Sequence, residues 1–287
     1  MSASSIALGF FDGVHIAHQN IISKAVEKAK QNNLHPIALS FDASPLEVLM
    51  MKKVKYLTSI KEKESLISSL GAELKTLHTD MKLLKLSPEA FVKNFLVEKY
   101  NAKYVVCGYN YTFGKNAAGD SNLLKSLGER YGFEVEIAEQ INIGGEAVSS
   151  SRIRSLLENG EIKEANLLLG RNFSVCGEVV HGKSLGSKIG FPTANVNMPC
   201  GIIIPKKGVY KSTVQLRGER FAAISNVGKN PTVGGEALRV ETYIPKINSS
   251  LYGETLKIGL EEFIRPEMGF ESVEKLREQI KKDVSLL

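Results

Sequence analysis

The apolar pattern of this chain changes near residue 171, and that change constrains the fold more than any other feature. Up to about residue 147, short apolar runs alternate with segments of helical period. The predicted strands cover 6–11, 36–41, 104–107 and 134–138, and the predicted helices cover 18–32, 60–70, 88–100 and 123–131. Such an alternation is typical of a parallel sheet covered by helices. We therefore expect an α/β domain at the N-terminus.

A helical hairpin is predicted to close this first part. The serines at 149–151 can cap a helix that runs through Glu158, Gly160 ends it, and 161–169 form a second short helix. The first domain is therefore expected to cover residues 1–170.

Residues 171–287 follow the pattern of an all-β fold with a helix at its end. Short alternating strands are predicted near 174–180, 209–216, 221–227, 239–244 and 255–263, separated by Gly, Pro and Asn turns. Evenly spaced short strands favour a small closed barrel. Ser272 can cap a final helix that carries an apolar face of Val273, Leu276, Ile280 and Val284.

Size and composition indicate a soluble protein of two domains. A chain of 287 residues exceeds the usual size of one domain, and 43% hydrophobic and 24% charged residues are ordinary values. No basic segment precedes an apolar run, and Asp12 interrupts the first apolar stretch, so neither a signal peptide nor a membrane span is predicted. We expect a cytoplasmic protein, whose three isolated cysteines stay reduced and form no zinc site.

The net charge of +6 and the pI near 9.0 fit anionic partners, either small molecules or nucleic acid. The lysines are scattered through segments such as 24–33 and 272–285 and are not gathered with aromatic residues into one strip. A nucleic-acid-binding protein is therefore not expected.

A glycine-rich stretch ends in the run Gly-Phe-Pro-Thr-Ala-Asn-Val at 190–196. Gly182, Gly186 and Gly190 are spaced by four and let the backbone approach an anionic group, while Pro192 fixes how the chain leaves the loop. This pattern predicts a phosphate-binding loop.

The same region contains a P-loop spacing, formed by Gly177, Gly182, Lys183 and Ser184. A P-loop needs a strand that leads into a flexible loop and then a helix. Residues 178–181 read as strand, and Gly186, Gly190 and Pro192 prevent a helix afterwards, so we do not interpret this spacing as a P-loop.

The 182–196 stretch resembles the nucleotide loop of the riboflavin kinase family. Further motifs similar to that family occur in its order at 208–210, 226–232, 240–241, 251–253 and 263–267. The resemblance covers about a hundred residues. It implies a six-stranded antiparallel barrel that transfers the γ-phosphate of ATP to the 5′-hydroxyl of riboflavin. One departure is Lys246-Ile247, where the family often has Asp-Phe.

Site roles in this domain follow from the same resemblance. It implies Glu241 as the base, Thr193 and Asn195 as ligands of Mg²⁺, and Arg265 and Glu267 as flavin contacts. The ATP phosphates would be held by the loop residues Gly182, Lys183, Gly186 and Gly190 together with Thr193 and Asn195. Alternatively, Glu241 is an ordinary exposed strand residue, Thr193 caps a turn, and Asn226 and Asn230 are turn residues.

A second motif lies where the first strand runs into a helix, between Gly9 and His18. Two histidines three apart at a helix start share a face, near free amides and the positive end of the helix dipole. The segment resembles the nucleotidyltransferase superfamily, and in particular the FMN adenylyltransferase module fused ahead of bacterial riboflavin kinases. The segments 108–114 and 149–154 match two further motifs of that module.

This second resemblance implies a Rossmann-like fold and an adenylyl transfer that converts FMN into FAD. His15 and His18 would stabilise the α-phosphate of ATP, and Arg152 or Arg154 could bind phosphate oxygens. The other residues implied to bind ATP or FMN are Gly9, Phe11, Asp12, Asn110, Ser149 and Ser150. The implied partners are thus riboflavin, FMN, FAD and ATP/ADP, with Mg²⁺ as cofactor. Self-association is left open.

The first domain departs from its family at two positions. Ala17 stands where the family usually has Gly, and Ser44 stands where it has the His of Pro-His-Pro. A methyl group can crowd a backbone that approaches phosphate. Three hypotheses follow: an enzyme that makes both FMN and FAD, a riboflavin kinase with a weakened first domain, or a flavin- or nucleotide-binding regulator without turnover.

Overall fold

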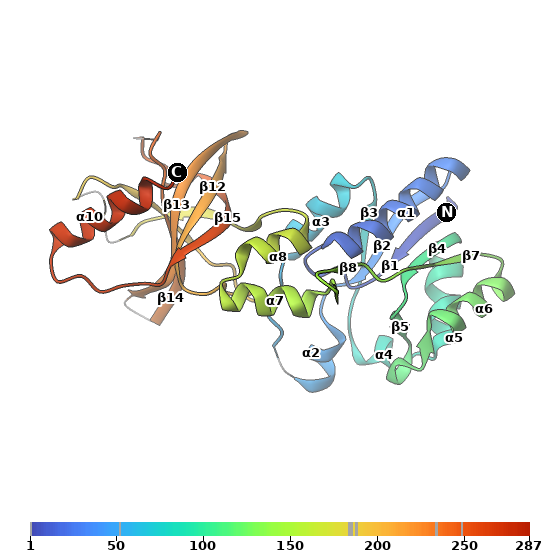
Figure 1. The fold of residues 1–287 in the computed structure, drawn as a ribbon. Helices are drawn as coiled ribbons and strands as arrows, with labels where there is room; N and C mark the ends of the chain where they lie inside the picture. The colour runs from blue at the N-terminus through green and yellow to red at the C-terminus, as the bar shows by residue number, and fades with distance from the viewer. Residues whose placement is uncertain (1, 52, 183–185, 187–188, 233–234, 248) are drawn as a thin grey trace. The chain divides into compact units, whose positions relative to one another are not determined.

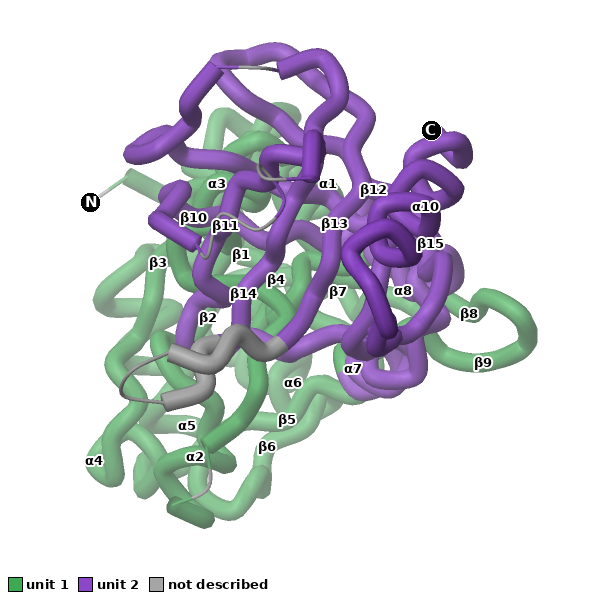
Figure 2. Tube along the Cα trace, turned by 90° about the vertical axis from the view of Figure 1, so that its left-hand side faces the viewer, with its two compact units in different colours: residues 1–150 green, residues 151–287 purple. Residues whose placement is uncertain are grey.

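The computed structural model describes residues 2–287 except 52, 183–185, 187–188, 233–234 and 248. Its contacts divide the chain into two compact units, residues 1–150 and 151–287 (Figure 2). This division places the helical hairpin with the second unit, whereas the predicted boundary at 170 places it with the first. The predicted boundary stays a prediction.

The first unit contains a five-stranded parallel sheet in the order β3-β2-β1-β4-β7 (Figure 1). Its strands are β1 (Ser4–Leu8), β2 (His35–Phe41), β3 (Glu73–Leu77), β4 (Ala102–Gly108) and β7 (Glu134–Ala138). The predicted parallel α/β sheet is confirmed. Strand β3 lacks the apolar run of a central strand because it lies at the edge of the sheet and is only partly buried.

Helices cover both faces of this sheet. The principal ones are α1 (Ile16–Asn32), α3 (Ile60–Ser69) and α6 (Ser121–Tyr131). Ala7 of β1 packs in a cluster with residues of α1 and α3, whereas its neighbours Ile6 and Leu8 pack in a second cluster with residues of α6. Alternate residues of one strand thus serve two cores.

Shorter elements connect these parts. They are α2 (Pro45–Met50), α4 (Met81–Leu84), α5 (Pro88–Phe91), β5 (Thr112–Phe113), η2 (Lys115–Ala117), β6 (Gly119–Asp120), β8 (Asn142–Ile143) and β9 (Glu146–Ala147). The helix predicted over 88–100 begins as α5 and continues as a π-helix, η1 (Val92–Lys99). The predicted hairpin is confirmed as α7 (Ser150–Asn159) and α8 (Ile162–Leu169).

The second unit is a closed antiparallel barrel in the order β10-β11-β14-β13-β12-β15. Its strands are β10 (Phe173–Val180), β11 (Thr193–Asn197), β12 (Gly208–Leu216), β13 (Glu219–Thr232), β14 (Gly235–Tyr243) and β15 (Thr255–Arg265). The pattern of apolar residues missed β11, because it begins directly after Pro192 and every second residue of it is polar. The closed barrel itself is confirmed.

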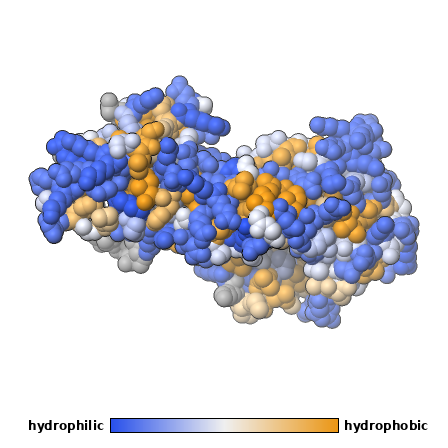
Figure 3. Space-filling model, in the orientation of Figure 1, coloured by the Kyte–Doolittle hydropathy of each residue, from blue (hydrophilic) through white to orange (hydrophobic). Residues whose placement is uncertain are grey.

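The predicted C-terminal helix is confirmed as α10 (Val273–Val284). Ser272 caps it, since the Oγ of Ser272 accepts a hydrogen bond from the backbone N–H of Lys275 at 3.2 Å. Hydrophilic residues dominate the surface visible in Figure 3, with apolar areas between them. Among the described residues, no helix combines the length and the apolar character needed to cross a membrane.

Candidate active sites

One row of residues crosses the barrel in register. The register pairs Asn195 with Glu241, and Glu241 with Asn226. It continues by pairing Asn226 with Val209, and Val209 with Arg265. Residues directly opposite one another on neighbouring strands point to the same face. The alternate residues are fully buried in the barrel interior, as Val196, Val240 and Val227 show, so the row lies on the outer face.

A cavity of about 350 Å³ opens against this row. Glu241 and Asn226 line it from the barrel, and Leu276 and Ile280 line it from α10. A second cavity of about 170 Å³ is lined by residues that include Pro192 and Tyr252. Thr193 lines both cavities. Two ligands could therefore meet at this threonine, one in each cavity.

The oxygens of Thr193 and Asn195 fit a magnesium ion. The two residues are separated by one position on β11 and share its outer face. Asn195 is 6% exposed, its Nδ2 donates to the backbone carbonyl of Thr193 at 3.4 Å, and its buried Oδ1 has no hydrogen-bond partner. A Cβ on Gly182 would lie 2.5 Å from the Nδ2 of Asn195, so only glycine fits there. A buried oxygen without a donor suits a hard cation.

The glycine loop folds back toward this pair. The backbone N–H of Phe191 donates to the carbonyl of Gly186 at 2.8 Å, and Gly190 has a positive φ of 86°. Lys183, the expected phosphate contact of this loop, lies outside the described residues. Gly177 lies inside strand β10, as the rejection of the P-loop spacing requires.

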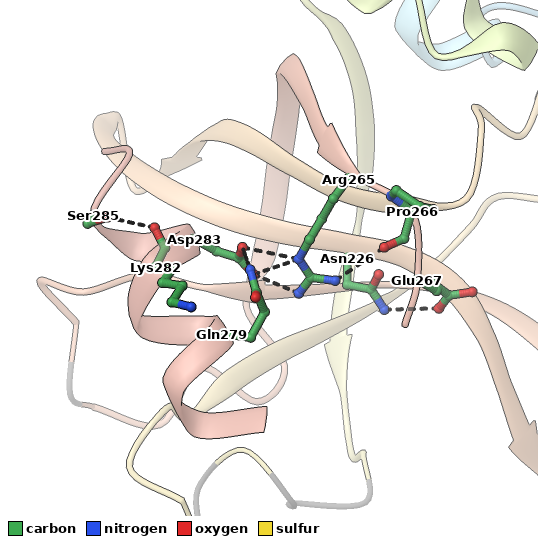
Figure 4. Close-up of polar contacts among 8 residues, drawn as sticks. All are labelled: Asn226, Arg265, Pro266, Glu267, Gln279, Lys282, Asp283 and Ser285. Atoms are coloured by element: carbon green, nitrogen blue, oxygen red, sulfur yellow. Dashed lines mark hydrogen bonds and ion pairs between the residues drawn. The ribbon is translucent and has the colours of Figure 1, made fainter. Parts of the chain in front are cut away.

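Arg265 is the last residue of β15, and Glu267 follows it closely in the chain (Figure 4). Both residues line the larger cavity. The Nδ2 of Asn226 donates to the Oε1 of Glu267 at 3.2 Å. A Cβ on Gly228 would lie 2.1 Å from that same oxygen, so Gly228 makes room for the carboxylate. Arg265 forms an ion pair with Asp283 of α10 at 2.7 Å. No motif of the sequence points to Asp283.

In the first unit, the loop between β1 and α1 places two histidines against each other. Three residues of this loop, Phe11, Gly13 and Val14, have positive φ angles. His15 caps α1, and its Nδ1 accepts a hydrogen bond from the backbone N–H of His18 at 3.4 Å. The two imidazole rings stack with centroids 3.6 Å apart. The shared face expected of this histidine pair is thus present.

The environment of His18 favours the neutral imidazole. Burial lowers the pKa of His18 well below its usual value, and the nearby His15 and Lys63 lower it further. The buried Nδ1 of His18 has no hydrogen-bond partner. A neutral imidazole can offer one N–H to an incoming phosphate oxygen.

Lys63 and Asp12 form hydrogen bonds that hold this loop in place. The Nζ of Lys63, a residue only 4% exposed, donates to the carbonyl of Phe10 at 2.9 Å and lies over the Phe10 ring. The carboxylate of Asp12 accepts hydrogen bonds from the backbone N–H groups of Leu57 at 2.9 Å and Thr58 at 3.4 Å. Burial lowers the pKa of Lys63 to about 8, while Asp12 acts in the opposite direction. Sequence reasoning missed Lys63, which the pattern shows only as one of many helical lysines.

Other predicted residues of the first unit lie near the same loop or support it. Gly9 makes room for the ring of Phe11, because a Cβ on Gly9 would lie 2.7 Å from that ring. The Oγ of Ser150 donates to the carbonyl of Asp12 at 2.9 Å, and its neighbour Ser149 is half-buried. Asn110 is exposed after β4, whose carboxyl end lies beside that of β1.

The two arginines of the 149–154 motif lie on α7. A terminal nitrogen of Arg152 donates to Glu164 of α8 at 2.6 Å, and this pair joins the two helices of the hairpin. Arg154 is half-buried. Phosphate binding by either arginine stays a prediction.

The two departures from the family have defined surroundings. Ala17 is half-buried in the first turn of α1, between the stacked histidines in sequence. Ser44 caps α2, with its Oγ accepting from the backbone N–H of Leu46 at 3.3 Å. His78, at the end of the neighbouring strand β3, pairs with Asp42 at 2.7 Å, and this hydrogen bond raises the pKa of His78. Asp42, two residues before Ser44 in the sequence, thus holds the imidazole of His78 near this loop.

Comparisons with known proteins identify a family for each part of the chain. A family model for FAD synthetase matches residues 1–152, and one for riboflavin kinase matches residues 169–287. The bifunctional riboflavin kinase/FMN adenylyltransferase of Listeria monocytogenes is 38% identical over 283 residues, which cover 97% of this chain and 89% of the relative. The protein of that name from Escherichia coli K12 is 32% identical over 97% of this chain and 90% of the relative.

Among solved structures, one described as a macrolide-efflux protein from Streptococcus pneumoniae superposes with a TM-score of 0.90. It is 31% identical and covers 100% of this chain and 94% of its own. Both modules are therefore matched in order, and relatives above 30% identity span nearly the whole chain. The chain belongs to the family of bifunctional riboflavin kinases/FMN adenylyltransferases, the FAD synthetase family.

Proposed function

We propose that Glu241 is the general base of the riboflavin kinase reaction in the barrel unit, in which the γ-phosphate of ATP is transferred to the 5′-hydroxyl of riboflavin. The chain has riboflavin kinase and FMN adenylyltransferase activities, as its family membership shows. The single observation that supports these roles most is the position of Glu241 between Asn195 and Asn226, on the wall of the 350 Å³ cavity. In this reaction the hydroxyl oxygen forms a bond to the γ-phosphorus, and the bond between that phosphorus and ADP breaks. Glu241 takes the hydroxyl proton as the nucleophile attacks.

The two cavities suggest how the substrates divide the site. The larger one has apolar side chains from α10 opposite polar side chains from the barrel, which suits a flat heteroaromatic ring with a polar ribityl chain. The smaller one, beside Pro192 and Tyr252, would take the nucleotide. The transferring phosphate would then lie near Thr193, the residue common to both.

Thr193 and Asn195 would hold Mg²⁺ through their side-chain oxygens. A magnesium ion bound to the nucleotide would neutralise phosphate oxygens as charge develops on them. The chain itself contributes the neutral oxygens and a backbone path, through Gly182, that comes close to Asn195.

The first unit would adenylylate the FMN that the barrel produces. The phosphate of FMN attacks the α-phosphorus of ATP, and pyrophosphate leaves. The stacked imidazoles of His15 and His18, at the start of α1, would donate hydrogen bonds to the α-phosphate as its charge increases. A cytoplasmic location and self-association stay predictions.

Replacement of Glu241 by Gln tests the assignment of the base. The amide keeps the shape but cannot accept the proton, so FMN formation should fall on the order of a hundred- to ten-thousand-fold. Initial rates of FMN formation from riboflavin and ATP measure this. Glu261, a half-exposed glutamate on strand β15 of the same barrel, provides the matched control as Glu261→Gln.

FAD formation from supplied FMN should be unchanged in Glu241→Gln, which shows that the α/β unit is folded and that the substitution acts on the barrel alone. Kinase turnover within a few-fold of wild type in that variant would overturn the role of Glu241.

A further inference from the structure

The C-terminal helix α10 forms one wall of the flavin cavity proposed above. It lies beside strand β13 (Figure 1). Leu276 and Ile280, one turn apart, line the cavity from this helix. Their position relative to the barrel therefore sets how wide the cavity is on its apolar side.

Apolar packing holds α10 only weakly. Leu276 and Ile280 are half-buried, and Val273 at the start of the helix is 50% exposed. The only residue of α10 that is fully buried is Asp283, at 3% exposed. An aspartate at the best-buried position of an amphipathic helix is unusual, because a buried carboxylate requires compensating partners.

Those partners come from β15 and from α10 itself (Figure 4). The Nε of Arg265 donates to both carboxylate oxygens of Asp283, at 3.1 and 3.2 Å, and a terminal nitrogen donates to Oδ2 at 2.7 Å. Gln279 adds a hydrogen bond to Oδ1 at 2.9 Å. The carboxylate thus receives charge-assisted hydrogen bonds in a forked geometry, which fixes direction as well as distance.

The guanidinium of Arg265 has all three nitrogens in use. The remaining terminal nitrogen donates to the carbonyl of Pro266 at 3.2 Å. Because Arg265 faces Asp283 in this way, it acts on a cavity ligand through α10 and not through a free guanidinium. The row of residues that contains Glu241 and Asn226 ends at Arg265, so the helix is tied to the strand register of the site itself.

We propose that the Arg265–Asp283 ion pair is a positioning clamp that holds α10 as the apolar wall against the isoalloxazine ring of the flavin. Arg265 and Asp283 are positioning residues for flavin binding, acting through Leu276 and Ile280. This proposal rests on the assignment of the larger cavity to the flavin.

A buried ion pair is well suited to this task. Leu276 and Ile280 could pack on the barrel in several registers, whereas a forked pair is satisfied in one. Removal of one partner leaves the other charged and uncompensated, so the helix would move to let water reach it. The wall would then withdraw from the ring.

Asp283→Asn tests the clamp, since it keeps the shape and removes the charge. We expect the KM for riboflavin to rise on the order of tenfold, because the ring loses burial against two aliphatic side chains. The kcat and the KM for ATP should stay within about twofold. Glu241 lies on the barrel, and no residue of α10 lines the nucleotide cavity. Quenching of riboflavin fluorescence by the full chain with ADP present should weaken in parallel.

Glu278→Gln is the matched control, because Glu278 lies on the same helix and is exposed. It should leave all three kinetic parameters unchanged. A KM for riboflavin in Asp283→Asn that stays within twofold of wild type would overturn the clamp. A fall in kcat with an unchanged KM would overturn it as well.

Gln279→Leu decides the case if Asp283→Asn does not fold. It removes one hydrogen bond from Asp283 and keeps the ion pair, so a smaller rise in the same KM supports the clamp and an unchanged KM overturns it. FAD formation from supplied FMN reports on the fold of the other unit. If Glu241→Gln abolishes turnover and these variants leave the riboflavin KM unchanged, only the clamp fails. If Glu241→Gln retains turnover, the proposed base fails independently.

Discussion

At the scale of single residues, Glu241 has surroundings that an isolated strand glutamate lacks. Its two cross-strand neighbours are Asn195 and Asn226, and each of these amides has a buried Oδ1 without a partner. Buried polar atoms are normally satisfied, and exceptions tend to mark ligand sites. Glu241 and Asn226 line one cavity, and Asn195 pairs with Glu241 on the other side. These surroundings favour a catalytic role over the exposed position usual for a strand glutamate.

Thr193→Val tests the neighbouring metal assignment. The substitution keeps the volume and deletes the hydroxyl, so Mg²⁺-dependent kinase activity should fall on the order of a hundredfold. Thr255→Val, at an exposed position of β15, is the control. FAD formation from supplied FMN should persist in both variants. An equal loss of both activities in Thr193→Val would indicate misfolding and would leave no support for a ligand role.

Lys63 makes a prediction about pH and stability. Its pKa is lowered to about 8 in the folded chain from 10.5, so the unfolded chain keeps this proton to higher pH. Stability rises with pH wherever the unfolded state binds more protons. The buried charge of Lys63 therefore lowers the free energy of unfolding most below pH 8, and this effect disappears as the pH rises toward 10.5. The difference in unfolding free energy between wild type and Lys63→Met should shift toward wild type by up to roughly 3 kcal/mol across that window.

Urea unfolding measured by pulse proteolysis gives this difference in free energy. Cleavage between residues 4 and 41 reports on the unfolding of the first unit. Lys61→Met, at an exposed position of the same helix, should show no such pH dependence. A difference that does not change with pH would mean that Lys63 is not held in the charged, buried state described here.

Residues that act through the fold were the ones that sequence could not identify. The motifs located Glu241, Thr193 and His15 because each stands in a distinctive local pattern. Lys63 and Asp283 take their importance from partners far along the chain, Phe10 and Arg265. The sequence does contain one signal for Asp283: it is a charged residue on the same helical face as Leu276 and Ile280.

At the scale of elements, the start of α1 brings the positive end of the helix dipole and two stacked imidazoles together. Loop residues with positive φ precede this helix. Lys63 and Ser150 donate hydrogen bonds to backbone carbonyls of the loop, and the carboxylate of Asp12 accepts one from the backbone N–H of Leu57. A conformation that is costly for non-glycine residues persists only where its surroundings determine it. These hydrogen bonds hold Phe11 and Val14 in their positive-φ conformations.

Ala17→Gly combined with Ser44→His tests whether the two departures slow adenylylation. A glycine lets the backbone approach phosphate closely, and a histidine adds a contact, so FAD formation from FMN should rise a few-fold. Kinase turnover is the internal control and should not change.

Ser44→His also removes the cap of α2, which costs about 1 kcal/mol, so the single Ala17→Gly variant is measured beside the pair. An unchanged rate in both variants would show that the two departures are neutral.

Element types could be predicted where a period is strong. The parallel strands β1, β2, β4 and β7, the helices α1, α3 and α6, and the capped α10 follow from apolar spacing and cap residues. Strand β3 could not be predicted because an edge strand needs no apolar run, and β11 could not because its polar residues serve the site. The π-helix η1 could not either, since its apolar residues also fit an ordinary helix.

At the scale of the whole molecule, the chain combines two units whose proposed reactions share ATP and are linked by FMN. FMN is the product of the barrel reaction and a substrate of the α/β reaction. The first unit has two apolar clusters of its own, and the barrel has a buried interior that includes Val196, Val227 and Val240. Substitutions in one site should therefore leave the other reaction intact. Each activity therefore reports on the unit that carries it, and its persistence shows that a substitution in the other unit acts locally.

Chromatographic separation of riboflavin, FMN and FAD after incubation of the full chain with ATP and Mg²⁺ tests whether each unit carries out the reaction assigned to it. Wild type supplied with riboflavin should form FMN and then FAD. Glu241→Gln should form neither from riboflavin but should convert supplied FMN into FAD, and His15→Ala with His18→Ala should accumulate FMN without FAD. FAD synthesis that survives the double histidine change, or FMN synthesis that survives Glu241→Gln, would contradict the account.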